Sequence, residues 1–217
     1  DLMAAASDRG PATPVRRVYT VAELDPRTSS RLISGVVVPR PIGWIGTLAA
    51  DGRRNLAPYS FFNAFNYTPP LVGFSSTAWK HTAQNCADTG EFTWNLVSRD
   101  LLVPMNETAT LSDVDEFVRA GLTPEASEVI AAPRVGEARV TFECRVTQQI
   151  ELTDVAGRPS GAVLTVGEVV MVHIDDDLLV DGIFDTVRAE PLLRGGGPTA
   201  YFGIADGSRL DLARPRD

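Results

Sequence analysis

The clearest pattern along the chain is an alternation of apolar and polar residues between positions 139 and 147. Successive side chains of an extended strand point to opposite faces, so alternate residues share a face. One face carries Val140, Phe142, Cys144 and Val146, and the other carries Arg139, Thr141, Glu143, Arg145 and Thr147. A connection through Gly157 leads to residues 162–174, a nearly continuous run of β-forming residues. The pattern predicts two long strands here.

A hairpin is predicted nearer the N-terminus. Its first strand covers residues 42–48, Asp51-Gly52 supplies the turn, and residues 55–60 form the returning strand. Shorter runs of the same kind predict strands at 71–75 and 92–97.

Two helices are predicted from their end signals. The first covers residues 25–34, with Asp25 as N-cap and Pro26 at the first helical position. The second covers residues 82–89 and is expected to stop at Gly90, because glycine readily adopts the left-handed conformation that ends helices.

The remaining segments complete the expected organisation. Residues 98–128 have mixed helical character, which Pro104 and Pro124 are expected to break. Residues 1–17 predict a flexible N-terminal arm, and residues 18–217 a single domain. There is no regular alternation of strands and helices, which disfavours a doubly wound parallel sheet. We expect a mainly β protein, an antiparallel barrel with peripheral helices.

Composition excludes several classes of function. The 217 residues carry a formal net charge of −8 and no dense basic run, so a nucleic-acid partner is not expected. No segment approaches the roughly 20 apolar residues of a membrane span, so we expect a cytoplasmic protein without membrane contact. The two cysteines, Cys86 and Cys144, are too few for a disulfide framework or a zinc site and are interpreted as small apolar core residues.

Common catalytic and nucleotide-binding motifs are absent from the sequence. No G-x-G-x-x-G follows a strand and no P-loop occurs, so neither a Rossmann nor a P-loop site is supported. His173 lies in an apolar strand pattern, where a hydrogen-bonded structural histidine is the favoured interpretation. Residues 175–177, three aspartates, lack the ligand spacing of a calcium loop and predict a solvated turn, so no metal is expected.

A candidate phosphate site precedes the second predicted helix. It comprises Ser75, Ser76, Thr77, Lys80, His81 and Thr82. The start of a helix presents unpaired N–H groups and a partial positive charge, and hydroxyls and a lysine beside it suit a phosphate. The alternative interpretation is structural: Thr82 caps the helix and the other residues form a loop.

The predicted hairpin offers a place for a flat ring. Small residues on its two strands, Gly46, Thr47, Ala57 and Ser60, would let a ring approach the backbone closely. Main-chain N–H and C=O groups there could pair with the polar edge of the ring. For the aromatic residues nearby, the alternative is ordinary core packing.

Five motifs in order resemble the flavin-reductase-like, FMN-binding split-barrel family. They are residues 38–47 (VPRPIGWIGT), 55–63 (NLAPYSFFN), 67–75 (YTPPLVGFS), 80–85 (KHTAQN) and 89–96 (TGEFTWNL). The resemblance covers roughly residues 25–203. It is closest to the branch that includes flavoredoxin and the reductase components of two-component monooxygenases.

The resemblance implies a six-stranded antiparallel split barrel that forms homodimers with FMN near the interface. Thr47 would then line the edge of the isoalloxazine, and Asn55 is a further cofactor-binding position in the same hairpin. The ring and ribityl chain would lie near Ala57, Tyr59, Ser60 and Phe62. The phosphate would be held by Ser75, Ser76, Lys80 and Thr82, with His81, at a position where Asp is common, able to assist. No catalytic side chain is assigned.

One departure from the family bears on the electron donor. Many shorter members carry a Gly-Asp-His motif thought to place nicotinamide, but the corresponding residues 160–166 contain no histidine. The leading hypothesis is a flavin reductase that takes a hydride from NADH or NADPH and supplies reduced flavin to a flavin-dependent monooxygenase. The alternatives are a flavoredoxin-like electron carrier and an FMN enzyme acting on its own organic substrate.

Overall fold

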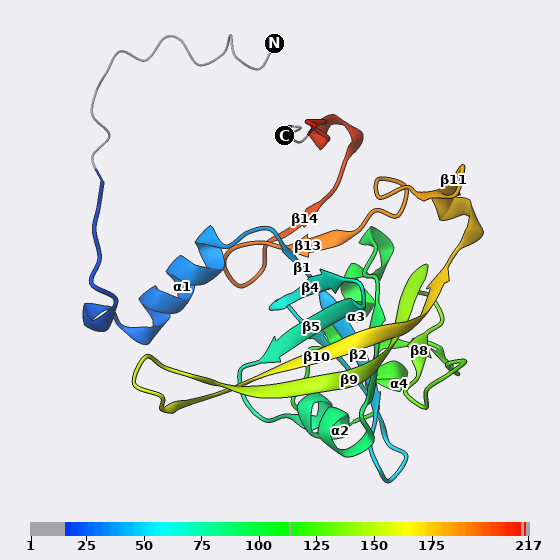
Figure 1. Ribbon diagram of the computed structural model, residues 1–217, viewed down its shortest axis with the longest axis horizontal. Helices are drawn as coiled ribbons and strands as arrows, with labels where there is room; N and C mark the ends of the chain where they lie inside the picture. Colours follow the sequence, from blue (N-terminus) through cyan, green and yellow to red (C-terminus); the bar gives the residue numbers. More distant parts are fainter. Residues whose placement is uncertain (1–15, 113, 214, 216–217) are drawn as a thin grey trace.

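The computed structural model describes residues 16–112, 114–213 and 215. The predicted arm at residues 1–17 therefore lies almost wholly outside the described residues. The main feature is an antiparallel sheet with the strand order β3-β2-β6-β9-β10-β5-β4 (Figure 1). Its strands are β2 (Gly43–Leu48), β3 (Arg54–Tyr59), β4 (Phe62–Tyr67), β5 (Pro70–Ser76), β6 (Glu91–Asn95), β9 (Val140–Thr153) and β10 (Pro159–Ile174).

Smaller sheets and helices surround this one. A three-stranded sheet joins β1 (Arg40–Pro41), β13 (Leu192–Arg194) and β14 (Tyr201–Gly203); β7 (Pro124–Glu125) pairs with β8 (Arg134–Val135), and β11 (Leu179–Val180) pairs with β12 (Ile183–Phe184). The α-helices are α1 (Pro26–Val36), α2 (His81–Thr89), α3 (Leu102–Glu107) and α4 (Glu116–Ala120). Short 3₁₀ turns are η2 (Val21–Glu23), η3 (Arg99–Leu101), η4 (Asp176–Leu178) and η5 (Asp206–Ser208).

The sheet curls into a barrel because its two ends meet. The chain passes from β3 directly into β4, and the Ser75 N–H of β5 donates to the Phe61 carbonyl at that corner, at 2.8 Å. The ring centroids of Tyr59 and Phe74 lie 4.7 Å apart across the same junction. No ladder joins β3 to β5 among the described residues. The predicted mainly β barrel is confirmed, with seven strands in the sheet where six were expected.

Neighbouring residues of one strand belong to different cores. Ile45 packs inside the barrel with Phe74 and Phe92, where Cys86 of α2 also lies. Trp44 faces outward and packs in a second cluster beneath α3 and α4. The period-two alternation of β2 therefore places apolar side chains on both faces, so the barrel is covered inside and out. Both cysteines are buried, as expected.

Most predicted elements are confirmed, but two features of the fold differ from expectation. Strand β4 was not predicted, because it interleaves asparagines with aromatic residues; it is exposed along its length except at Phe62. Pro104 does not break the helical segment, because it lies in the first turn of α3, where main-chain N–H groups have no intrahelical acceptor. His173 is a structural histidine, as expected: its Nε2 lies 2.7 Å from the buried Glu143 Oε1.

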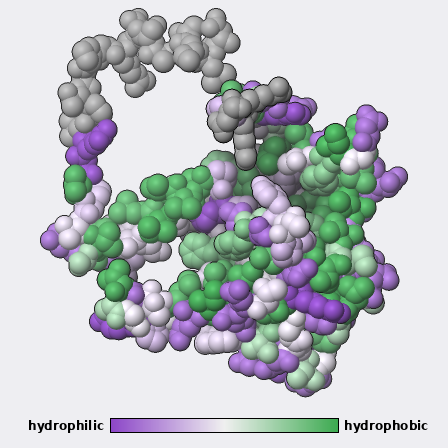
Figure 2. Space-filling model, in the orientation of Figure 1, coloured by the Kyte–Doolittle hydropathy of each residue, from purple (hydrophilic) through white to green (hydrophobic). Residues whose placement is uncertain are grey.

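Helix α1 stands off from the rest of the chain. Asp25 caps it by accepting the Thr28 N–H at 3.0 Å, and the helix continues two residues beyond its predicted end. No residue of α1 is buried, and apolar side chains along it remain exposed (Figure 2). No helix in the described part of the chain is long and apolar enough to cross a membrane.

Candidate functional site

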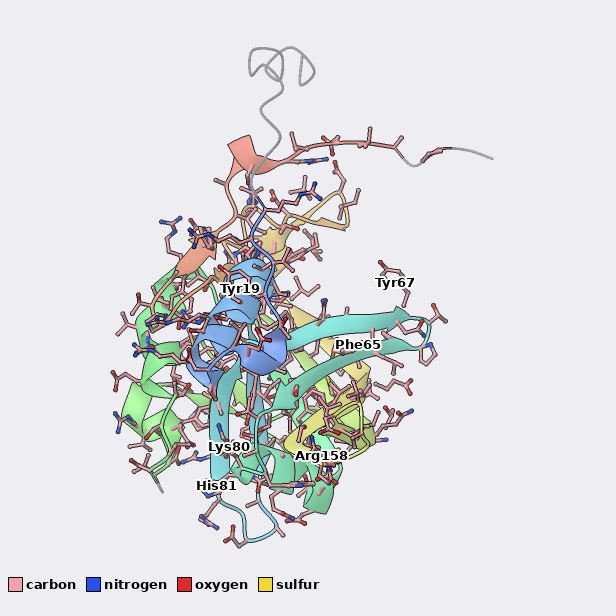
Figure 3. The ribbon with its side chains drawn as sticks, turned by 90° about the vertical axis from the view of Figure 1, so that its left-hand side faces the viewer. Tyr19, Phe65, Tyr67, Lys80, His81 and Arg158 are labelled. Carbon is pink, nitrogen blue, oxygen red and sulfur yellow. The ribbon has the colours of Figure 1, made fainter. Side chains whose placement is uncertain are left out.

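The candidate site lies where the β3–β4 corner, the end of β5 and the start of α2 meet. In Figure 3, Lys80 and His81 lie together at the start of α2, below α1, whereas Phe65 and Tyr67 lie on the β4–β5 hairpin, which projects to one side. The pairing of β10 with β5 places Leu164 opposite Ser75 on this junction. Segments far apart in the sequence thus border one region of the surface.

The start of α2 has no side-chain cap. Its N-cap residue is Lys80, whose side chain has no hydrogen-bond acceptor, and the first main-chain bond of the helix runs from Gln84 to the Lys80 carbonyl. The three N–H groups before Gln84 consequently lack helical partners, as at any helix start. Thr82 is not the cap, so the structural alternative for this residue is wrong. Lys80 and His81 are both exposed, and Lys80 is the only lysine in the sequence.

Behind this helix start lies a buried network of hydroxyls and amides. The Asn55 Nδ2 donates to the Thr47 Oγ1 at 3.2 Å and to the Thr82 Oγ1 at 2.9 Å. The Asn85 Nδ2 donates to the same Thr47 oxygen at 3.0 Å. All four residues are at least nine-tenths buried. Thr47 and Asn55 therefore tie the β2–β3 hairpin to α2, and their side-chain polar atoms bond within the chain.

Tyr59 connects this network to β5. Burial raises the pKa of its hydroxyl, although hydrogen bonds with Thr82 and Ser76 partly oppose the rise. The Ser76 hydroxyl also donates to the Ala78 carbonyl at 2.6 Å, which shapes the loop leading to Lys80. Tyr59, Ser76 and Thr82 are therefore interior groups that position the helix start.

A hollow of about 310 Å³ lies on the surface next to the C-terminal end of α1. Ser60, Phe62 and Ser75 line it, together with Arg40 and Leu164. The Phe62 ring stacks on Trp94 with a centroid distance of 5.5 Å and an interplanar angle of 4°. Of the predicted ring-binding residues, Ala57 instead packs against the inner core.

Arg40 organises this hollow, and sequence reasoning missed it. Its buried guanidinium donates to the carbonyls of Ser34 and Val37 at the end of α1, of Ser60 at the β3–β4 corner, and of Gly195. One side chain thus joins three segments. The sequence feature that could have identified Arg40 is its position in the motif at 38–47, where this arginine is flanked by two prolines.

The flavin reductase like domain model matches residues 35–193, well over half of the chain. The chain belongs to the flavin reductase-like family. The matched range begins in α1 and ends in β13, so it includes every candidate site residue described above.

Solved structures agree with the assignment of this flavin reductase-like chain. Nitrilotriacetate monooxygenase component B from Bacillus cereus has a TM-score of 0.86 at 28% identity, covering 92% of this chain and all of that one. A Shewanella frigidimarina NCIMB 400 protein with a split barrel domain has a TM-score of 0.77 at 28% identity, covering 89% and 96%. Flavoredoxin of Desulfovibrio vulgaris (Miyazaki F) has a TM-score of 0.70 at 25% identity, covering 82% and 91%.

The family uses a flavin, and the residues of this chain fit one. A helix start whose N-cap residue is a lysine suits an anionic group, because a cationic residue stands beside main-chain N–H groups that have no helical acceptor. A stacked aromatic pair beside main-chain carbonyls suits a flat ring with a polar edge. The sequence-predicted residues do not all surround one hollow. Ser60, Phe62 and Ser75 line the smaller hollow, Lys80 and His81 are exposed at the start of α2, and the remaining polar residues are buried: Thr47, Asn55, Tyr59, Ser76 and Thr82.

Proposed function

We propose that this chain binds FMN and acts as a flavin reductase that takes a hydride from NADH or NADPH. The observation that carries the proposal is the start of α2, which has three N–H groups without helical partners and the only lysine of the sequence at its N-cap. A terminal phosphate distinguishes FMN from riboflavin, and this arrangement suits a phosphate.

The ring would lie in the hollow beside α1. Phe62, held by its stacking on Trp94, offers an apolar face there, and Ser60 and Ser75 supply polar groups at its edge. Bound FMN would supply the redox chemistry, while the chain binds it, orients it and limits access of water. Hydride transfer to a flavin requires no acid–base side chain, which agrees with the absence of an assigned catalytic residue.

We further propose that a second copy of the chain covers the hollow. Exposed apolar side chains gather on that side of the molecule: Ile33, Val36 and Val37 at the end of α1, and Phe65 and Tyr67 on β4. Figure 1 shows the far end of the β9–β10 hairpin extending toward the same side as α1. Exposed apolar surface of this extent is typical of an interface, so a homodimer with FMN near the interface is expected. Light scattering at low micromolar concentration tests this, and a monomer that holds FMN tightly would contradict it.

The reduced flavin would be passed to a flavin-dependent monooxygenase. The similarity to a monooxygenase component B supports this partner. An electron carrier is the second candidate, favoured by the similarity to flavoredoxin and by the lack of histidine at residues 160–166. The visible spectrum of the purified protein, before and after anaerobic addition of NADH or NADPH, distinguishes the two. Bleaching of the flavin supports the reductase, and bound flavin that neither nicotinamide reduces supports the carrier.

A further inference from the structure

A second, larger cavity of about 630 Å³ opens at the end of the barrel that carries the β2–β3 turn. Its walls come from this turn, from the start of α2, from the residues that begin α4, and from the segment after β7. Small-molecule sites usually have volumes between roughly 300 and 1,000 Å³. Of the residues assigned above to the flavin, Asn55 and His81 border this cavity, whereas the ring-binding hollow lies elsewhere.

The part of the cavity wall that follows β7 has no regular secondary structure, but hydrogen bonds to buried or neighbouring carboxylates fix its position. The buried Glu143 accepts the N–H groups of Glu128 and Val129 at 2.7 and 2.8 Å. The Glu91 carboxylate accepts the Ala131 N–H at 2.7 Å. Carboxylates that accept main-chain N–H groups make strong, charge-assisted hydrogen bonds. The cavity is therefore formed before any ligand enters it.

The charged side chains of the wall are mostly paired. Arg53 lies 2.8 Å from Asp51, Arg54 contacts Asp115, and Glu125 lies 3.2 Å from Arg134. Each of these pairs is neutral as a whole. A ligand gains little from contacting a cation whose charge a neighbouring carboxylate already balances.

Glu116 is the exception. Its side chain borders the cavity, the residue is 4% exposed, and its Oε2 accepts the Leu56 N–H at 3.2 Å. Among the described residues, no lysine, arginine or histidine lies within 4.0 Å of this carboxylate. Burial raises the pKa of Glu116, and the more distant His81 opposes the rise in part. A buried carboxylate without a cation is costly unless something pairs with it.

We propose that this cavity is a binding site for a small organic cation, which donates an N–H to the Glu116 carboxylate. The apolar part of the ligand would lie against Leu48, Val114 and Pro133, which border the same cavity. The charge of the ligand would balance Glu116, the carboxylate of the wall that has no cation beside it among the described residues. The cavity shares Asn55 and His81 with the residues assigned to the flavin, but the proposal rests on Glu116 and not on flavin binding.

Benzamidine is a suitable probe, because it joins a flat apolar ring to a cationic amidine. Calorimetric titration of the full chain, with whatever flavin it carries, should show saturable binding. Benzoate has a similar shape and the opposite charge, and it should not bind. Glu116→Gln keeps an acceptor for the Leu56 N–H but removes the charge, and it should weaken benzamidine binding at least tenfold. Glu125→Gln is the matched control, because Glu125 already pairs with Arg134, and it should leave the affinity within about twofold.

A second variant tests the cavity without touching Glu116. Ala131→Phe places a ring on the exposed rim and leaves the main-chain bond to Glu91 in place, so it should abolish binding while the circular dichroism spectrum is retained. The proposal is overturned if benzoate binds as tightly as benzamidine, or if folded Glu116→Gln or Ala131→Phe binds benzamidine like the wild type. Displacement of bound FMN by benzamidine would also overturn it, because the cavity would then belong to the flavin site.

Discussion

Replacing Lys80 with alanine should weaken FMN binding about tenfold. A hydrogen bond to a charged group contributes about 1.5–3 kcal/mol, whereas exposed ion pairs contribute about 0.2–1 kcal/mol. Lys80 is exposed, and the N–H groups of the first turn of α2 remain in the variant. The expected loss therefore lies near the lower end of the first range, about 1.4 kcal/mol, which is tenfold in affinity.

Titration of the apoprotein with FMN, followed by flavin fluorescence, measures this change. Lys80→Arg keeps the positive charge and is expected to lose much less affinity. Riboflavin lacks the phosphate and should bind the wild type and Lys80→Ala equally. Equal FMN affinity in wild type and Lys80→Ala, or an equal loss for riboflavin, would refute the placement of the phosphate at α2.

A chemical test needs no variant. Because Lys80 is the only lysine of the sequence, an amine-reactive reagent has two targets, this side chain and the N-terminal amine. Bound FMN should protect the first target and leave the second unchanged. Mass spectrometry of the labelled peptides reports both, so the N-terminal amine serves as an internal control. Labelling of Lys80 at the same rate with and without saturating FMN would count against the assignment.

Three further predictions concern the hollow, the dimer and the buried carboxylate. Gly43→Ala would place a Cβ 2.9 Å from the Phe62 ring and push that ring off Trp94. The affinity for FMN should fall, and the ratio of the affinities for FMN and riboflavin should change less; paired titrations with both flavins measure this. Ile33→Asp should convert the proposed dimer to monomers in light scattering with the barrel still folded, since Ile33 is exposed in the single chain. Burial raises the pKa of Glu143, but the N–H groups it accepts and His173 outweigh this and hold it below the ordinary value. The contribution of Glu143 to the free energy of unfolding is thus fully present above the ordinary carboxyl pKa and is lost as the pH falls through the lowered pKa. The free energies of unfolding measured with urea at pH 7 and pH 3 should therefore differ less for Glu143→Gln than for the wild type.

Local signals in the sequence were enough to predict the elements whose ends they define. Asp51-Gly52 predicts the β2–β3 turn, and Gly52 has the positive φ of 87° that such a turn requires. Gly90, at a φ of 71°, ends α2 as predicted. In each case, the deciding interaction lies within a few residues of the signal, so no knowledge of the fold was needed.

The rest depends on contacts between distant segments. The residues around Glu116 are acidic and resemble a solvated surface, and only the packing of α4 against β3 buries that side chain. The role of Arg40 likewise depends on the fold, because the carbonyls that accept its hydrogen bonds are between 3 and 155 positions away in the sequence. The hairpin and the residues before α2 were singled out correctly as neighbours. The direction in which Thr47 and Asn55 point, toward α2, follows from the fold and not from the local sequence.

The isolation of α1 makes its own order depend on its surroundings. A helix of 11 residues is marginally stable in water by itself, and α1 buries none of its side chains against its own chain. Hydrogen bonds from Arg40 connect the last turn of α1 to the barrel. The rest of the helix is stabilised only by what packs on it from outside the chain. The proposed second copy of the chain would provide this cover, and dilution would remove it by mass action. Specific activity and flavin content should therefore fall together as the protein is diluted, and storage concentration becomes a variable that assays of this chain need to control.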